Sequence, residues 1–214
     1  MIAPRMINRR MIDRRVFLAT LAAATLPARA FAAPATLKAG EILRGRFTQD
    51  RYLKGFAAPI RSDGSFVLSA GQGLIWRVAK PFATTTVITP EGLVQVANGR
   101  ELTRLSATRA PFLARLFDVL NAVMAGDWTQ VETMFAVTRA PAGGAERLTL
   151  TPRRPEDAAA SRIQSIAVTI DRFAQDVEIR RADDDYDRLA FVDQTVSAGP
   201  LSADEQTLFD SARS

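Results

Sequence analysis

The chain has 214 residues, no cysteine and no histidine, and it carries 28 basic against 23 acidic side chains. The lack of cysteine excludes disulfides, and the lack of histidine excludes Ser-His-Asp and Cys-His catalysis and disfavours a zinc site. The sequence also lacks a Gly-x-Ser-x-Gly elbow, a phosphate-binding loop and a dinucleotide fingerprint. We therefore expect a protein that is not an enzyme and uses no metal and no cofactor.

Residues 1–32 have the three-part build of a cleaved export signal. Paired arginines precede the apolar run Val16–Leu26, and the small-x-small site Ala30-Phe31-Ala32 follows it. The apolar run has only 11 residues, too few to cross a bilayer as a helix. We expect cleavage after this segment and one exported, soluble domain over residues 33–214 in the periplasm.

Two export routes fit this leader. Arg14-Arg15 followed by Phe17-Leu18 resembles the twin-arginine motif, and Arg29 near the cleavage site suits that route. Ala19 stands where that motif prefers lysine, so an ordinary secretory signal is the alternative.

Removing the leader also removes the positive charge. Residues 1–32 hold six arginines and one aspartate, so subtracting them from the whole chain leaves 22 basic and 22 acidic groups. A neutral domain gives no electrostatic reason to expect a nucleic-acid partner.

After residue 39, short strand-like runs alternate with turn signals rich in Gly, Pro, Asp and Asn. The runs are Ile42–Leu53, Gly64–Ser69, Leu74–Val78, Thr84–Thr89, Leu93–Asn98, Glu101–Leu105, Met134–Arg139, Arg147–Thr151, Ile163–Asp171, Ala174–Arg181 and Arg188–Val196. About eleven short strands at this spacing predict a mainly β fold with some α, an antiparallel meander that curls into a barrel or half-barrel.

Two segments have helical signals. Between Pro111 and Gly126 an apolar stripe recurs at intervals of three and four residues. The stripe consists of Phe112, Leu113, Leu116, Phe117, Leu120, Val123 and Met124. A second helix is predicted over Ser202–Ala212, because Ser202 and Glu205 have the spacing of a capping box. We expect the first helix to lie across the open mouth of the curved sheet.

A series of short motifs resembles the outer-membrane lipoprotein carrier (LolA) family, in a divergent branch. In chain order the motifs are Gly45-Arg46-Phe47-Thr48-Gln49, Gly64-Ser65-Phe66-Val67-Leu68, Gly73-Leu74-Ile75-Trp76, Lys80-Pro81-Phe82, Ile88-Thr89-Pro90-Glu91-Gly92-Leu93, Gly126-Asp127, Phe135, Leu148-Thr149-Leu150-Thr151-Pro152, Ile166–Asp171 and Val177–Arg181. The resemblance covers residues 42–196.

The resemblance implies an unclosed antiparallel barrel capped by helices, with an apolar cavity between them. It implies a carrier that holds the acyl chains of a lipidated protein, as a monomer, between an inner-membrane transporter and an outer-membrane acceptor. Acyl-chain binding needs only an apolar concave surface and a mobile lid, because each buried CH₂ contributes about 0.8 kcal/mol to the binding free energy. The alternative is a lipid-binding or sensing module in an envelope lipid or pigment pathway.

Period-two alternation nominates the residues of the cavity. The candidates on strands are Phe47, Phe66, Leu68, Leu74, Trp76, Ile88, Val94 and Val96. The candidates on the lid helix are Phe112, Leu116, Phe117 and Leu120. Ordinary core packing is the competing interpretation of each of these side chains.

The chain departs from the family pattern at one position. The resemblance implies an arginine six residues before the tryptophan, which holds the lid shut, but Ala70 stands there. Arg51, Arg61 and Arg77 are the candidate substitutes. Without that arginine, a free lipid or a lipid-linked metabolite is an alternative cargo to a lipoprotein.

The acidic run Asp183-Asp184-Asp185 resembles part of a calcium loop, but it lacks the ligand spacing and the closing glutamate. We interpret it as the tip of a hairpin.

Overall fold

The computed structural model describes residues 36–110, 117, 118, 122, 128–156, 158 and 162–213. All of them belong to the compact unit Phe31–Ser214. The predicted export signal and most of the predicted helix between Pro111 and Gly126 lie outside the described residues. Phe117, Asp118 and Ala122 are described, and all three are helical.

Eleven strands form, and each corresponds to a predicted run. They are β1 (Glu41–Tyr52), β2 (Ile60–Ser69), β3 (Gly73–Lys80), β4 (Thr84–Thr89), β5 (Gly92–Ala97), β6 (Arg100–Ser106), β7 (Phe135–Ala142), β8 (Ala145–Pro152), β9 (Ile163–Ile170), β10 (Ala174–Arg181) and β11 (Tyr186–Ala198). The mainly β prediction is confirmed.

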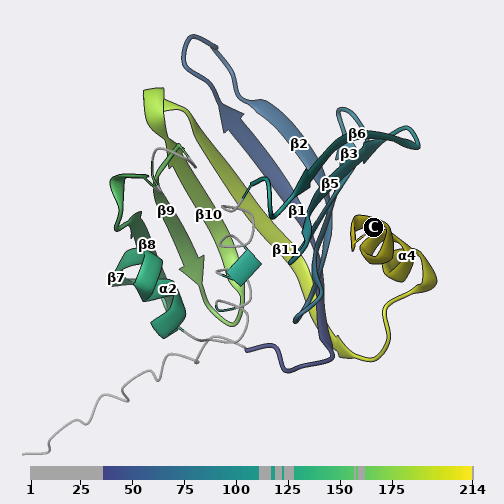
Figure 1. Cartoon of the computed structure of the whole chain (residues 1–214). Coiled ribbons are helices and arrows are strands. Elements are labelled where there is room, and N and C mark those ends of the chain that lie inside the picture. The colour runs from purple at the N-terminus through teal and green to yellow at the C-terminus, as the bar shows by residue number, and fades with distance from the viewer. Residues whose placement is uncertain are drawn as a thin grey trace, which may run out of the picture. The chain divides into compact units, whose positions relative to one another are not determined.

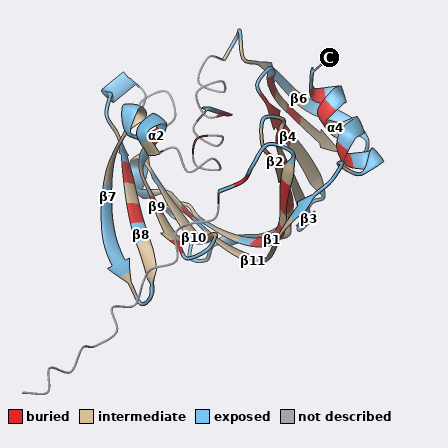
Figure 2. Ribbon diagram, turned by 90° about the horizontal axis from the view of Figure 1, so that it is seen from below, coloured by how far each residue is buried: buried red, intermediate tan, exposed pale blue. Residues whose placement is uncertain are grey.

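The strands make one antiparallel sheet in the order β6-β5-β4-β3-β2-β1-β11-β10-β9-β8-β7. Two meanders meet where β1 pairs with β11, the first and last strands of the chain. β6 and β7 remain as the two edges, so the sheet is not closed into a barrel. The sheet curves strongly, which gives it one concave and one convex face (Figures 1 and 2).

Tight turns keep the first meander in register. Between β5 and β6 the two-residue turn Asn98-Gly99 has φ of 50° and 71°, and Ala97 pairs with Arg100. Positive φ at both positions is the requirement of a type I′ hairpin turn, which Asn-Gly meets at low steric cost.

The convex face of β1–β5 is covered by a helix, α4 (Ala203–Arg213), which lies outside the curve of the sheet (Figure 2). Their shared core consists of Ile42, Val67, Ile75, Val87, Val94, Phe209 and Ala212. Ile75 and Phe209 have no exposed surface. This face is therefore an ordinary sealed core.

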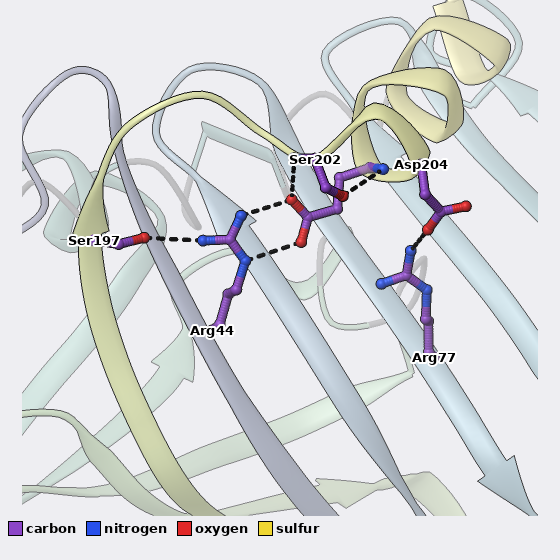
Figure 3. Close-up of polar contacts among 6 residues, drawn as sticks. Arg44, Arg77, Ser197, Ser202 and Asp204 are labelled. Carbon is purple, nitrogen blue, oxygen red and sulfur yellow. Dashed lines mark hydrogen bonds and ion pairs between the residues drawn. The ribbon is translucent and has the colours of Figure 1, made fainter.

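Polar contacts fix the start of α4, and they confirm the predicted capping box (Figure 3). The Glu205 backbone N–H donates to Ser202 Oγ (3.2 Å), and the Ser202 N–H donates to Glu205 Oε2 (2.8 Å). Arg44 of β1 donates to both carboxylate oxygens of Glu205, at 2.9 and 2.6 Å. Hydrogen bonds from Arg44, aided by Ser202, lower the pKa of Glu205 to about 2 despite its burial.

A short helix, α2 (Trp128–Met134), precedes β7 and was not predicted. Its Val131 is fully buried in a cluster with Leu148, Leu150 and Ile170. Seven residues are too few to display a helical period clearly, so the sequence prediction began a strand at Met134 instead. Among the described residues, no helix is long and apolar enough to span a bilayer.

The acidic run forms the connection from β10 to β11, where a single 3₁₀ turn, η1 (Ala182–Asp184), lies. Asp183 pairs with Arg162 at 2.6 Å, and Asp184 pairs with Lys54 at 3.5 Å. The described part of the chain holds no cluster of three or more acidic side chains arranged to bind a metal ion.

Candidate functional site

The concave face of β1–β3 and β11 carries a cluster of aromatic rings. Phe47 stacks on Trp76, with 3.6 Å between the ring centroids. Phe191 meets both Phe66 (5.4 Å) and Trp76 (6.1 Å) edge to face. Phe47 and Phe66 are buried, whereas Trp76 and Phe191 remain partly exposed. Such rings offer a large apolar area at low entropic cost.

Two motif glycines make room for these rings. A Cβ on Gly45 would lie 2.7 Å from the Phe66 ring. A Cβ on Gly64 would lie 1.8 Å from the Arg77 carbonyl oxygen and 2.9 Å from the Phe47 ring. The Gly-x-Phe and Gly-x-Phe-x-Leu patterns in the sequence thus have a packing reason, because only glycine lets the rings lie flat on the strands.

The apolar surface continues across the sheet. Directly opposite residues on antiparallel strands share a face. Gln49 opposes Leu189, Leu189 opposes Val177, Val177 opposes Val168, and Val168 opposes Leu148. This row joins the aromatic cluster to the core under α2, so one apolar face runs along the concave side from β3 to β8.

Six of the eight strand candidates lie on this concave face: Phe47, Phe66, Leu68, Leu74, Trp76 and, opposite Leu74, Ile88. The structure brings them together, and their contact with a ligand stays a prediction. Of the helix candidates, Phe117 is helical and buried, whereas Phe112, Leu116 and Leu120 lie outside the described residues.

Val94 and Val96 correct the predicted face. Val94 belongs to the core beneath α4, and Val96 packs against that core. The tight turn pairs Thr89 with Gly92, so Leu93 opposes Ile88 and Val94 opposes Val87. The sequence prediction assigned β5 without this register and was therefore one residue out.

Sequence reasoning also missed members of the concave face in the second half of the chain. Phe191, Leu189, Val177 and Val168 lie in predicted strands but were not nominated. The available signal was alternation, which is clear for Val177 between Asp176 and Glu178 but weak for Phe191 between Ala190 and Val192. It becomes decisive only when the pairing of β1 with β11 joins the two halves.

One end of the concave face is polar. The Asp187 carboxylate accepts hydrogen bonds from Gln49 Nε2 (3.1 Å) and Arg51 Nε (2.8 Å), and it pairs with Arg181. Burial raises the pKa of the Asp187 carboxyl. Hydrogen bonds from Arg51 and Gln49 and the charges of both arginines outweigh burial, so its pKa lies below the usual value. Gln49 of the Gly-x-Phe-x-Gln motif thus helps to hold a buried charge.

The three candidate lid arginines are separated by the fold. Arg77 pairs with Asp204 of α4 on the convex side, and Arg61 pairs with Asp50. Only Arg51 lies on the concave face, where Asp187 is its partner. A cleft of about 540 Å³ includes Arg46 and Arg77 in its lining, and these two arginines are already paired with Asp193 and Asp204.

A protein-family model matches most of the chain. The model of the family described as outer membrane lipoprotein carrier protein LolA-like matches residues 32–189. No curated protein matches the chain.

Three solved structures illustrate the likeness to known folds. A LolA superfamily protein from Nitrosomonas europaea is 8% identical, with a TM-score of 0.39 over 85% of this chain and 93% of that one. A lipoprotein-sorting protein domain from Vibrio parahaemolyticus is 9% identical, with a TM-score of 0.38 over 79% and 91%. A chain of the Pseudomonas aeruginosa MucA/MucB complex is 13% identical, with a TM-score of 0.42 over 77% and 54%, so this protein spans about half its length.

The family model covers well over half of the sequence and includes strands β1 to β10. The protein therefore belongs to the LolA-like family of outer membrane lipoprotein carrier proteins.

Proposed function

We propose that this protein is an exported carrier that binds the acyl chains of lipoproteins or lipids on its concave face and shuttles them towards the outer membrane. The leader 1–32 would direct it to the periplasm. An inner-membrane transporter would load it, and an outer-membrane acceptor would unload it.

The observation that supports this proposal most directly is the partly exposed apolar surface on the concave side. On the convex side the central apolar side chains beneath α4, such as Ile75 and Phe209, are fully buried. On the concave side Trp76, Leu68, Leu74 and Phe191 keep part of their surface. An unclosed sheet that presents aromatic rings matches a ligand that needs apolar area and no chemical step. Burial of an acyl chain contributes about 0.8 kcal/mol per CH₂.

Tryptophan fluorescence tests this proposal directly. The chain has two tryptophans, so Trp128→Phe leaves Trp76 as the only reporter. We expect an acyl chain brominated near its end to quench Trp76 fluorescence in a saturable way. Native mass spectrometry of protein purified from the periplasm should show bound lipid or lipoprotein.

Variants separate ligand binding from folding. The Trp76 variants lose the reporter, so their binding is followed through the fluorescence of a labelled acyl probe. Trp76→Glu should abolish binding of this probe, and Trp76→Ala should weaken it. Thr85→Glu is the matched control, since Thr85 opposes Val96 and its charge would lie on the convex face. Empty protein in native mass spectrometry together with no probe uptake by the folded wild type would refute the carrier function.

A further inference from the structure

Three charged side chains from neighbouring strands gather at the polar end of the concave face. Arg51 of β1 lies directly opposite Asp187 of β11. On the other side of β11, Asp187 opposes Ile179 of β10, and Arg181 is two residues further along that strand. Since residues two apart on a strand share a face, all three point to the concave side.

Asp187 is the anchor of this group. Its side chain is only 1% exposed, and it is held between Arg51 and Arg181 with Gln49 as a further donor. A buried carboxylate with several donors is fixed in position, and it fixes the guanidinium groups that bind it. The two arginines are therefore ordered before any ligand arrives.

Both arginines keep donors that Asp187 does not use. Each guanidinium has five N–H groups, and among the described residues Asp187 is the only side chain that accepts from Arg51 or Arg181. Their side chains are 46% and 30% exposed. Two positive charges face one negative charge, so the group has a spare positive charge.

Of the surrounding acids, Asp183 is paired with Arg162 and Asp184 is paired with Lys54. The Asp185 carboxylate offsets the spare charge in the local sum, but it accepts the Lys54 backbone N–H, so the unused guanidinium donors of Arg51 and Arg181 stay available to a ligand. Two residues beyond Asp187 along β11, Leu189 opposes Val177, and this pair begins the apolar surface. Unused guanidinium donors next to a long apolar wall match the two parts of an amphiphile with an anionic head.

We propose that Arg51 and Arg181 bind the anionic headgroup, a phosphate or a carboxylate, of the lipid whose acyl chains lie on the concave face. This inference rests on the proposed carrier function and adds a class of cargo to it. Guanidinium groups suit this role because their planar donors match the oxygens of phosphate and carboxylate.

The test compares three probes on the full mature protein: pyrene-labelled phosphatidylglycerol, a pyrene-labelled diacylglycerol with the same chains, and inorganic phosphate alone. We expect the phosphatidylglycerol to bind at least about tenfold more tightly than the diacylglycerol, a factor that corresponds to 1.4 kcal/mol. That advantage should shrink as salt rises, whereas diacylglycerol binding should not weaken. Phosphate alone should compete weakly, because it gains nothing from the apolar wall.

The variant Arg51→Gln/Arg181→Gln should lose the tenfold advantage and keep diacylglycerol binding. Arg61→Gln is the matched control: it also removes a positive charge near this end of β1, but Arg61 is 72% exposed and pairs with Asp50. If the double variant fails to fold, as judged by near-ultraviolet circular dichroism, Arg181→Gln alone should lose part of the advantage.

The outcomes distinguish the two proposals. Equal binding of both lipids by the wild type, or an advantage that survives in the folded Arg51 and Arg181 variants, overturns the headgroup site and leaves the carrier function intact. Binding of phosphate alone as tightly as phosphatidylglycerol would assign the arginines to a free anion and would also overturn it. Failure of both lipids to bind would remove the carrier function itself.

Discussion

The two faces of the first meander have similar apolar side chains but opposite environments. In β3, Leu74 and Ile75 are adjacent in the sequence, yet Ile75 is fully buried beneath α4 and Leu74 is partly exposed on the concave face. A helix and a partly buried ion pair cover one face, whereas side chains on the other face of the same strands stay partly exposed. A sealed core on the convex side can thus hold the strands in place while apolar side chains on the other face stay partly exposed.

The largest expected effect comes from exchanging the two neighbours for alanine. Ile75→Ala should lower the free energy of unfolding by about 3–4 kcal/mol, because it leaves a cavity in the closed core. Leu74→Ala should cost only about 1 kcal/mol, since part of that side chain already contacts solvent. Urea unfolding measures both. Acyl-probe affinity should show the reverse order, and equal stability losses would contradict the contrast between the faces.

Loss of the Arg44–Glu205 ion pair at the start of α4 should have an intermediate effect on the free energy of unfolding. Glu205→Gln keeps a side chain able to cap the helix but leaves the partly buried Arg44 guanidinium without a carboxylate. We expect a loss of about 2 kcal/mol in the free energy of unfolding. Asp204→Asn, one residue earlier, removes the exposed pair with Arg77 and should cost less than about 0.5 kcal/mol. Similar losses of stability in both variants would show that burial does not make the Arg44–Glu205 pair stronger than the Arg77–Asp204 pair.

Sequence reasoning found the features that depend on local pattern. Alternation and turn residues located all eleven strands, and the Ser202 and Glu205 spacing located the start of α4. It could not place α4 on the convex face, because that depends on contact between Arg44 and Glu205, which are 161 residues apart.

The candidate site was predicted in part for the same reason. Phe47, Phe66 and Trp76 share a face because Phe47 opposes Gly64 and Phe66 opposes Trp76, and alternation within each strand indicated that face. Val94 and Val96 were assigned to the wrong face because one turn sets the register of β5. The group around Asp187 was invisible in the sequence, since three strands must pair before Arg51, Asp187 and Arg181 meet.

The last predicted effect is the pH dependence that Glu205 contributes on the convex face. The pKa of Glu205 falls from its ordinary 4.5 to about 2 in the folded protein, so its contribution to stability is complete well above pH 4.5. The contribution declines as the pH falls below 4.5 and is lost as the pH falls through 2. Between pH 7 and pH 4 the loss should be about 0.8 kcal/mol at most, less because solvent screens the one-third-exposed Arg44. The difference in unfolding free energy between the wild type and Glu205→Gln isolates this effect. It should be smaller at pH 4 than at pH 7, and a difference that is unchanged or larger at pH 4 would show that the Arg44 contact does not hold the Glu205 carboxylate ionised.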